Sequence, residues 1–276
     1  MTQALTVQSY LKDANVQTRI AELLKDRAGQ FTTSLLSAVN ANEKLSLCKP
    51  ETVMNAALTA ASLDLPINPN LGFAYIIPYK DEAQFQMGYK GFIQLAQRSG
   101  QYKTIASTTV YEGQLVSEDP LKGNVYDWKA KTSDTVLGYV ALFELMNGFE
   151  KTMYMTAAEM TKHGKKFSQT FKKGFGMWVD DFESMALKTV LKLLISKFGP
   201  MNTTMQKAIQ YDQAVVKDAE VVYADNDALE HVGADDDKKD AIVAAHTTEA
   251  ETTLEDKPKA EEAKDDTDAP GSTGKS

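Results

Sequence analysis

The sequence has little of the chemistry on which most enzymes and secreted proteins depend. It contains one cysteine, Cys48, and three histidines among 276 residues, and a single thiol excludes a disulfide framework. Residues 1–16 lack the basic cluster and apolar run of a signal peptide. No stretch approaches the roughly 18 consecutive apolar residues of a membrane helix. These absences predict a cytoplasmic protein with a reduced thiol and no membrane partner.

Candidate catalytic groups are equally scarce, because no pair of histidines has metal-ligand spacing. Asp180, Asp181 and Glu183 could form the carboxylate cluster of a metal-dependent nuclease, but acidic residues are also ordinary in the first turn of a helix. Residues 269–276 match a phosphate-binding loop loosely, without the strand and helix that such a loop needs. We therefore expect no catalytic set, no ATP site and no required cofactor; a divalent metal is allowed but not indicated.

The net charge of −8 hides two regions of opposite sign. Residues 1–210 carry 23 Lys+Arg against 19 Asp+Glu, a balance of +4. Residues 211–276 carry 7 against 19, a balance of −12. A basic body joined to an acidic tail is a hint of polyanion binding.

The acidic tail has too few apolar residues to form a hydrophobic core. Leu, Ile, Val and Phe make up 9 of its 66 residues, a share that, with high net charge, is typical of disorder. We expect a folded domain over residues 1–218 and a disordered acidic tail over 219–276, with a transient helix at 240–246.

The body shows a mixed pattern of apolar periodicities. Turn residues separate β-branched and aromatic runs, which predict strands at 73–78, 84–88, 102–111, 135–145 and 149–155. Helical spacing and end signals predict helices at 16–27, 30–41, 51–63, 89–99, 177–198 and 203–215. Strands and helices in this order predict an α+β fold, a single domain with a small antiparallel sheet flanked by helices.

Two of these helices carry candidate phosphate-binding groups. Lys90, Gln94 and Arg98 share one face of helix 89–99, which begins at the glycine pair Gly88 and Gly91. That junction could bring backbone N–H groups close to a phosphate, or the glycines could serve only tight packing of strand on helix.

Helix 177–198 is apolar almost all round, so it should be largely buried. Its one polar stripe, Ser184, Lys188, Lys192 and Ser196, suits the floor of a groove that meets phosphates, or a solvated strip of snorkelling lysines. Just upstream, five lysines alternate with Phe167, Phe171 and Phe175, a mixture seen where single-stranded nucleic acid is bound but also in mobile basic loops.

Three runs of sequence carry a family resemblance. They are GFAYIIP from Gly72 to Pro78, MGYKGFIQLAQRSG from Met87 to Gly100, and WVDDFESMALKTVLK from Trp178 to Lys192. Together they resemble the RecT family of phage recombinases, and the similarity covers about residues 45–215 in order. Gln97 and Lys192 stand where the pattern leads us to expect arginine, and both replacements keep a polar or basic group.

The resemblance implies an ATP-independent single-strand annealing protein, encoded by a phage or prophage. Such proteins coat the single-stranded DNA left by a 5′-to-3′ exonuclease, form rings or helical filaments as homo-oligomers, and pair the strand with its complement. Because two strands repel, lysine and arginine must neutralise phosphates while base edges stay free. We expect DNA contacts at Lys90, Arg98, Lys103, Lys188, Lys192, Tyr89 and Phe92.

Assembly on DNA is expected because annealing needs more contiguous nucleotides than one domain spans, with helices 16–27 and 30–41 packing on a neighbour. Two other functions stay open at this point: a metal-dependent nuclease and a purely structural oligomer.

Overall fold

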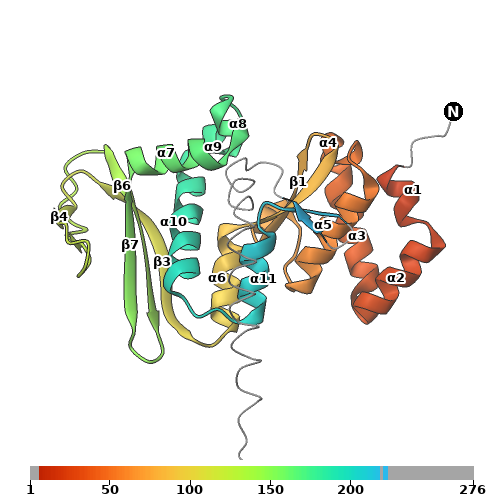
Figure 1. Cartoon of the computed structure of the whole chain (residues 1–276), viewed down its shortest axis with the longest axis horizontal. Helices are drawn as coiled ribbons and strands as arrows, with labels where there is room; N and C mark the ends of the chain where they lie inside the picture. Colours follow the sequence, from red (N-terminus) through yellow and green to blue (C-terminus); the bar gives the residue numbers. More distant parts are fainter. Residues whose placement is uncertain (1–5, 218–219, 223–276) are drawn as a thin grey trace, which may run out of the picture. The chain divides into compact units, whose positions relative to one another are not determined.

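Helices and short antiparallel strands alternate in the part of the chain that the structure, a computed structural model, describes: residues 6–217 and 220–222 (Figure 1). The α+β class with small antiparallel sheets is therefore confirmed. The expected acidic tail and the helix expected at 240–246 lie outside these residues, apart from β9 (Glu220–Val222). Because β9 pairs with β8 (Val215–Lys217), the described structure crosses the boundary expected at residue 218.

The N-terminal part is helical. Its elements are α1 (Val7–Leu11), α2 (Ala14–Leu24), a 3-10 turn (Lys25–Arg27), α3 (Ala28–Asn40), α4 (Glu43–Ser46) and α5 (Pro50–Ser62). Asp13 starts α2 by accepting the backbone N–H groups of Asn15 and Val16, as an N-cap does. Pro50 occupies the first turn of α5, where its missing N–H costs nothing. The three expected helices are confirmed with small shifts of their ends; α1 and α4 were not expected.

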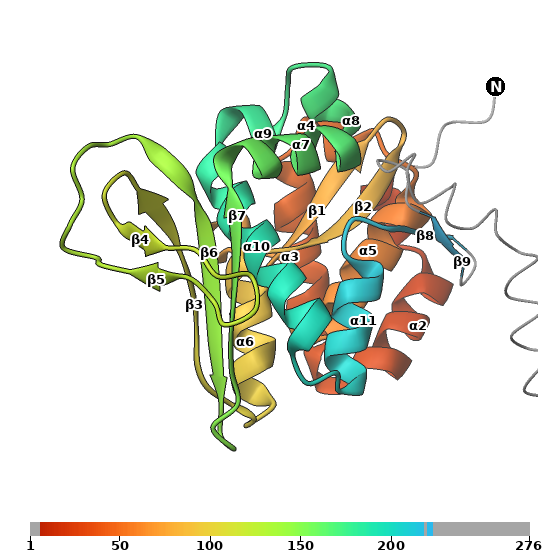
Figure 2. The same cartoon turned by 60° about the vertical axis from the view of Figure 1, so that its left-hand side comes forward.

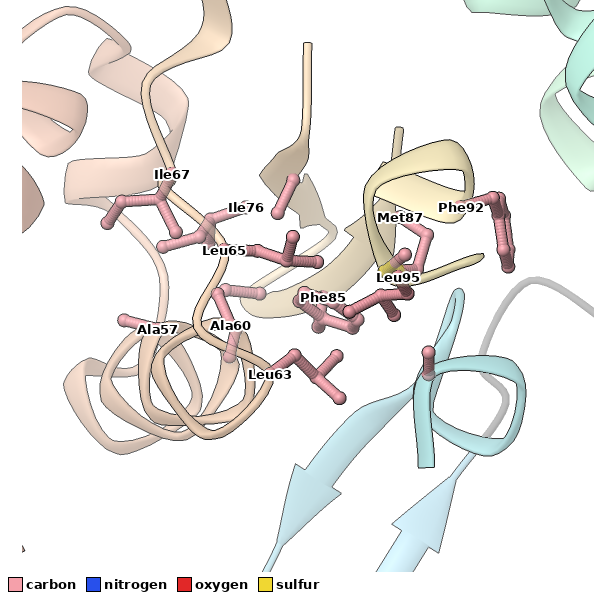
Figure 3. Packing of buried hydrophobic residues seen from close by; sticks show 14 of the residues in the cluster. Ala57, Ala60, Leu63, Leu65, Ile67, Ile76, Phe85, Met87, Phe92 and Leu95 are labelled. Carbon is pink, nitrogen blue, oxygen red and sulfur yellow. The ribbon is translucent and has the colours of Figure 1, made fainter. Parts of the chain in front are cut away.

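A β-hairpin and a helix follow. After a 3-10 turn (Pro69–Leu71), strand β1 (Ala74–Tyr79) pairs with β2 (Glu82–Met87) and turns at Lys80. Helix α6 (Tyr89–Arg98) begins at once after β2. Phe85 is completely buried, and Figure 3 shows it between Ala60 and Leu63 on one side and Leu95 on the other. The hairpin is thereby fixed between α5 and α6.

The second sheet has the strand order β3-β6-β7, formed by β3 (Tyr102–Tyr111), β6 (Val136–Leu145) and β7 (Glu150–Thr156). The turn between β6 and β7 contains Gly148 at φ 85°. Between β3 and β6 the chain forms a small pair, β4 (Leu115–Ser117) and β5 (Val125–Tyr126). In both views this pair lies on the side of the sheet away from α6 (Figures 1 and 2).

Four helices follow the sheet: α7 (Ala157–Phe167), α8 (Gln169–Lys172), α9 (Met177–Asp180) and α10 (Phe182–Phe198). The single helix expected over 177–198 is wrong at Asp181, which adopts φ −147° and separates α9 from α10. The Asp181 carboxylate accepts the Ser184 N–H there and begins α10 as its N-cap. Helix α10 packs on β3, β6 and β7 and against α6 (Figure 1).

The last helix, α11 (Thr203–Tyr211), ends four residues before the expected position. Asp212 is buried, Gln213 has φ 68°, and Ala214 pairs with Phe85 at the edge of the hairpin. Helical continuation is lost because the backbone instead pairs with β2 and the Asp212 carboxylate has partners elsewhere. No helix among the described residues is long and apolar enough to cross a membrane.

Candidate nucleic-acid interface

One buried carboxylate organises the polar stripe of α10. Asp212 accepts the Met87 N–H at 2.8 Å through Oδ1, and Lys192 Nζ lies 2.6 Å from Oδ2. Lys188 Nζ lies 3.4 Å from Oδ1. The cluster therefore joins the end of β2, the middle of α10 and the segment after α11. Sequence reasoning missed Asp212, because Met87 is 125 residues away along the chain.

Burial and charge shift the pKa values in this cluster. Burial alone would raise the pKa of Asp212, but Lys188, Lys192 and the Met87 N–H outweigh burial and hold that pKa below its usual value. Burial lowers the pKa of Lys188, and the attraction of Asp212 offsets only part of this. Two lysine side chains share one carboxylate, so the cluster has one more basic group than acidic groups.

The two lysines are not equivalent. Lys188 is only 6% exposed, so the expectation that both lysines lie open on a groove floor is wrong for Lys188. The Lys192 side chain is 26% exposed. Both border a cavity of about 210 Å³ that His163, Phe167 and Trp178 also line. Contact of either lysine with DNA stays a prediction.

Electrostatics at the cavity disfavour a further charge. Burial, and then the nearby Lys192 and Lys166, lower the pKa of His163. The imidazole is therefore kept neutral near pH 7, and Lys192 is the partly exposed cation among the residues that line this cavity.

The glycines before and within α6 are explained by packing. A Cβ on Gly88 would lie 2.0 Å from the Gly72 carbonyl oxygen, and one on Gly91 would lie 2.2 Å from the Phe73 carbonyl oxygen. The Gly88 N–H also donates to Phe73 O at 2.8 Å. Close approach of two backbones thus requires these glycines, which favours the packing interpretation over a phosphate loop.

Three predicted contacts on α6 lie at different depths. Phe92 is completely buried in the core, and Tyr89 is partly buried, with its hydroxyl accepting the Ser107 N–H at 3.3 Å. Lys90 is exposed, and its aliphatic part lies over Gly72. Of these three side chains, Lys90 is therefore the one whose charge faces solvent.

Arg98 and Lys103 already have protein partners. Arg98 donates to the carbonyl oxygens of Leu63 and Asp64 at 3.0 and 2.7 Å, beyond the end of α5. Lys103 pairs with Glu144 across β3 and β6 at 2.7 Å. The Arg98 guanidinium satisfies backbone carbonyl groups that the end of a helix leaves unpaired. The exposed ion pair between Lys103 and Glu144, in contrast, contributes little to stability.

A second cationic surface lies on α7 and α8. It comprises five exposed lysines, Lys162, Lys165, Lys166, Lys172 and Lys173. No ion pair joins them to a carboxylate in the part of the chain that the structure describes. Phe171, by contrast, stacks on buried Trp178 with ring centroids 5.6 Å apart. Of the three rings expected to alternate with these lysines, Phe171 packs inward, whereas Phe175 is 55% exposed.

The three carboxylates of the nuclease alternative do not form one site. Asp181 caps α10, and Glu183 accepts the hydroxyl of Thr109. No group of three or more His, Cys, Asp or Glu residues that could hold a metal ion is found among the described residues. Buried Cys48 has a pKa raised by burial and by Asp81 and Glu82, which disfavours a reactive thiolate.

By fold and charge the chain is an α+β protein with a cationic helical face. It belongs to the RecT family, whose family model matches residues 29–227, so the resemblance read from the sequence is confirmed. The chain is 49% identical over 208 residues to the uncharacterized protein YqaK of Bacillus subtilis, covering 75% of this chain and 72% of that one. It is 26% identical over 224 residues to Protein RecT of Escherichia coli, covering 75% and 80%. Family membership supports a role in recombination or strand annealing.

Proposed function

We propose that this chain is an ATP-independent single-strand annealing protein of homologous recombination. It binds single-stranded DNA left by a 5′-to-3′ exonuclease, assembles on it as a ring or helical filament, and pairs it with its complement. Its setting is the cytoplasm of a bacterial host, with a phage or prophage as its source. The observation that carries this proposal is the match of the RecT family over residues 29–227.

The exposed lysines provide the positive charge that binding to DNA requires. Neutralising phosphates releases counterions and drives binding without reading base edges. We assign direct phosphate contact to Lys90, to Lys192 at the rim of its cavity, and to the lysines of α7 and α8. Arg98 and Lys103 would have to exchange their present partners to bind DNA. Lys188 and Phe92 lie in the interior, where they support the surface that carries the contacts.

An annealing assay tests the function. Two complementary oligonucleotides, one with a fluorophore and one with a quencher, are mixed with the protein in EDTA and without ATP. We expect faster annealing and intact oligonucleotides on a denaturing gel. An annealing rate equal to that without protein would contradict the proposal and favour a purely structural oligomer. Cleavage that appears only when Mg²⁺ is added would establish the nuclease alternative.

A pair of variants tests the assigned surface in the same assay. Lys165→Ala with Lys166→Ala removes two charges from α7, and Lys12→Ala with Lys25→Ala removes two exposed charges from the N-terminal part. The α7 variant should bind DNA more weakly and with a flatter salt dependence, whereas the control should match the wild type. Equal effects of both variants would argue against a local DNA-binding surface.

A further inference from the structure

The segment between β3 and β6, residues 112–134, carries apolar side chains that nothing in the described chain covers. We call it the lobe; it includes β4 and β5 (Figure 2). Val116, Leu121, Val125 and Trp128 are all at least half exposed there, Leu121 to 85%. Exposed apolar groups gathered on one projection mark an interaction surface.

Trp128 is held rigidly despite its exposure. Its ring stacks on Tyr126 with centroids 5.0 Å apart, and its carbonyl oxygen accepts from the buried amide of Gln114 at 3.1 Å. A rigid exposed indole loses little entropy on binding, and tryptophan is enriched among residues that dominate binding energy.

The charge of the lobe disfavours DNA as its partner. Residues 112–134 contain five Asp or Glu residues and three lysines, a balance of −2. A net negative lobe repels phosphates, so its apolar residues suit a protein surface that is itself basic.

The same chain offers such a surface. A groove of about 340 Å³ lies between α4, the hairpin turn and α8, and it is lined by Lys44, Leu47, Lys80, Lys173 and Phe175 among others. Leu47 is 80% and Phe175 55% exposed, and none of the lining residues is acidic. In both views the groove elements and the lobe lie apart (Figures 1 and 2).

We propose that the acidic, apolar lobe of one copy docks in this basic, apolar groove of a second copy. The inference rests on the proposed function, in which the chain assembles on DNA. Because lobe and groove are different surfaces, each copy uses its lobe on one neighbour and its groove on the other. Such head-to-tail contacts close into rings or extend into helical filaments.

Mixing two defective variants tests this arrangement. Trp128→Ser damages the lobe and Phe175→Ser damages the groove, whereas Leu23→Ser alters an exposed leucine of α2 and is the control. The mass of complexes on a long oligo-dT strand is measured for each full-length protein, alone and in equal mixture. We expect the lobe and groove variants each to need about 30-fold or more protein to assemble, the scale set by a tryptophan that dominates an interface.

The mixture is the decisive sample. One intact lobe and one intact groove remain per pair of variants, so the mixture should form pairs that do not grow further. Failure to pair would show that lobe and groove do not fit each other and would overturn the inference. Wild-type assembly by each single variant, or loss of assembly only in Leu23→Ser, would also overturn it.

Charge exchange keeps the test valid if the apolar variants unfold. Glu118→Lys and Lys44→Glu should each weaken assembly, and the two changes in one chain should restore it. Both Lys44 and Glu118 lie outside the assigned DNA contacts. A groove variant that changes only DNA affinity would mean that the groove holds DNA or the acidic C-terminal segment, which contradicts the proposal. Binding of a short oligonucleotide by single copies tests the proposed function separately, because it needs no contact between copies.

Discussion

Replacing Asp212 should destabilise the fold far more than replacing the lysine buried beside it. Asp212→Asn keeps the shape of the side chain and an oxygen for the Met87 N–H, but it removes the negative charge between Lys188 and Lys192. Lys188→Met instead removes one of two positive charges and leaves Lys192 paired with Asp212 at 2.6 Å.

The expected magnitudes follow from burial. The Asp212 side chain is 1% exposed and that of Lys188 7%, and removing one partner of a buried ion pair costs about 3–5 kcal/mol because the other charge stays buried. For a domain of this size that loss lowers Tm by roughly 6–20 °C. Lys188→Met should be neutral or stabilising, because an apolar side chain avoids the desolvation of a buried ammonium group.

The pH dependence has a defined sign. The folded-state pKa of Asp212 lies below its usual value, so its contribution is present above the unfolded pKa of about 4 and is lost as pH falls through the lower folded pKa. Urea unfolding at pH 7 and pH 3 measures both effects. The reasoning would be refuted if Asp212→Asn cost less than about 1 kcal/mol at pH 7, well below the range for a broken buried pair, or if Lys188→Met cost as much as Asp212→Asn.

The remaining predictions concern DNA binding and packing. Lys192→Ala should reduce the slope of log affinity against log salt by about 0.7, the value for one phosphate on a single strand. Lys188→Met should leave this slope unchanged. Equal slopes for the two variants would contradict the assignment of phosphate contact to Lys192. Gly88→Ala should lower the free energy of unfolding by about 3 kcal/mol or more through overpacking, because the new Cβ would lie 2.0 Å from a backbone oxygen. Gly29→Ala is the control in the same unfolding experiment, because its Cβ would meet nothing within 4 Å. Truncation after Val222 should tighten DNA binding at low salt, because it removes acidic residues that compete with DNA for the basic body of the protein. The gain in affinity should shrink near physiological salt, where the Debye length is about 8 Å. A gain that persisted in high salt would contradict this competition.

Elements with strong local signals were predictable from the sequence. Helices 51–63 and 89–99 have clear ends at Pro50 and Gly100, and the structure confirms both within one residue at each end. The strands of the β3-β6-β7 sheet are confirmed in the same way, because β-branched and aromatic runs bounded by turns are visible locally.

Elements decided by distant partners were not predictable. Nothing near Asp212 in the sequence signals that its carboxylate meets Met87 and two lysines of α10, so the expected helix 203–215 runs past its true end. The polar stripe containing Lys188 was recognised, but the burial of Lys188 was not. Periodicity shows which residues share a face of a helix, but it does not show which other elements cover that face. Whether a lysine is open to DNA depends on that cover.

The runs that carry the family resemblance meet at this same carboxylate. Met87 opens the second run, whereas Lys188 and Lys192 close the third, and Asp212 binds all three from outside both runs. Lys90 follows Met87 by three residues at the start of α6. Because Asp212 fixes β2 against α10, it also fixes the start of α6 relative to Lys192. Two of the lysines to which we assign phosphate contact, Lys90 and Lys192, are thus held at one junction, which positions them before DNA arrives and lowers the entropy cost of binding a flexible strand.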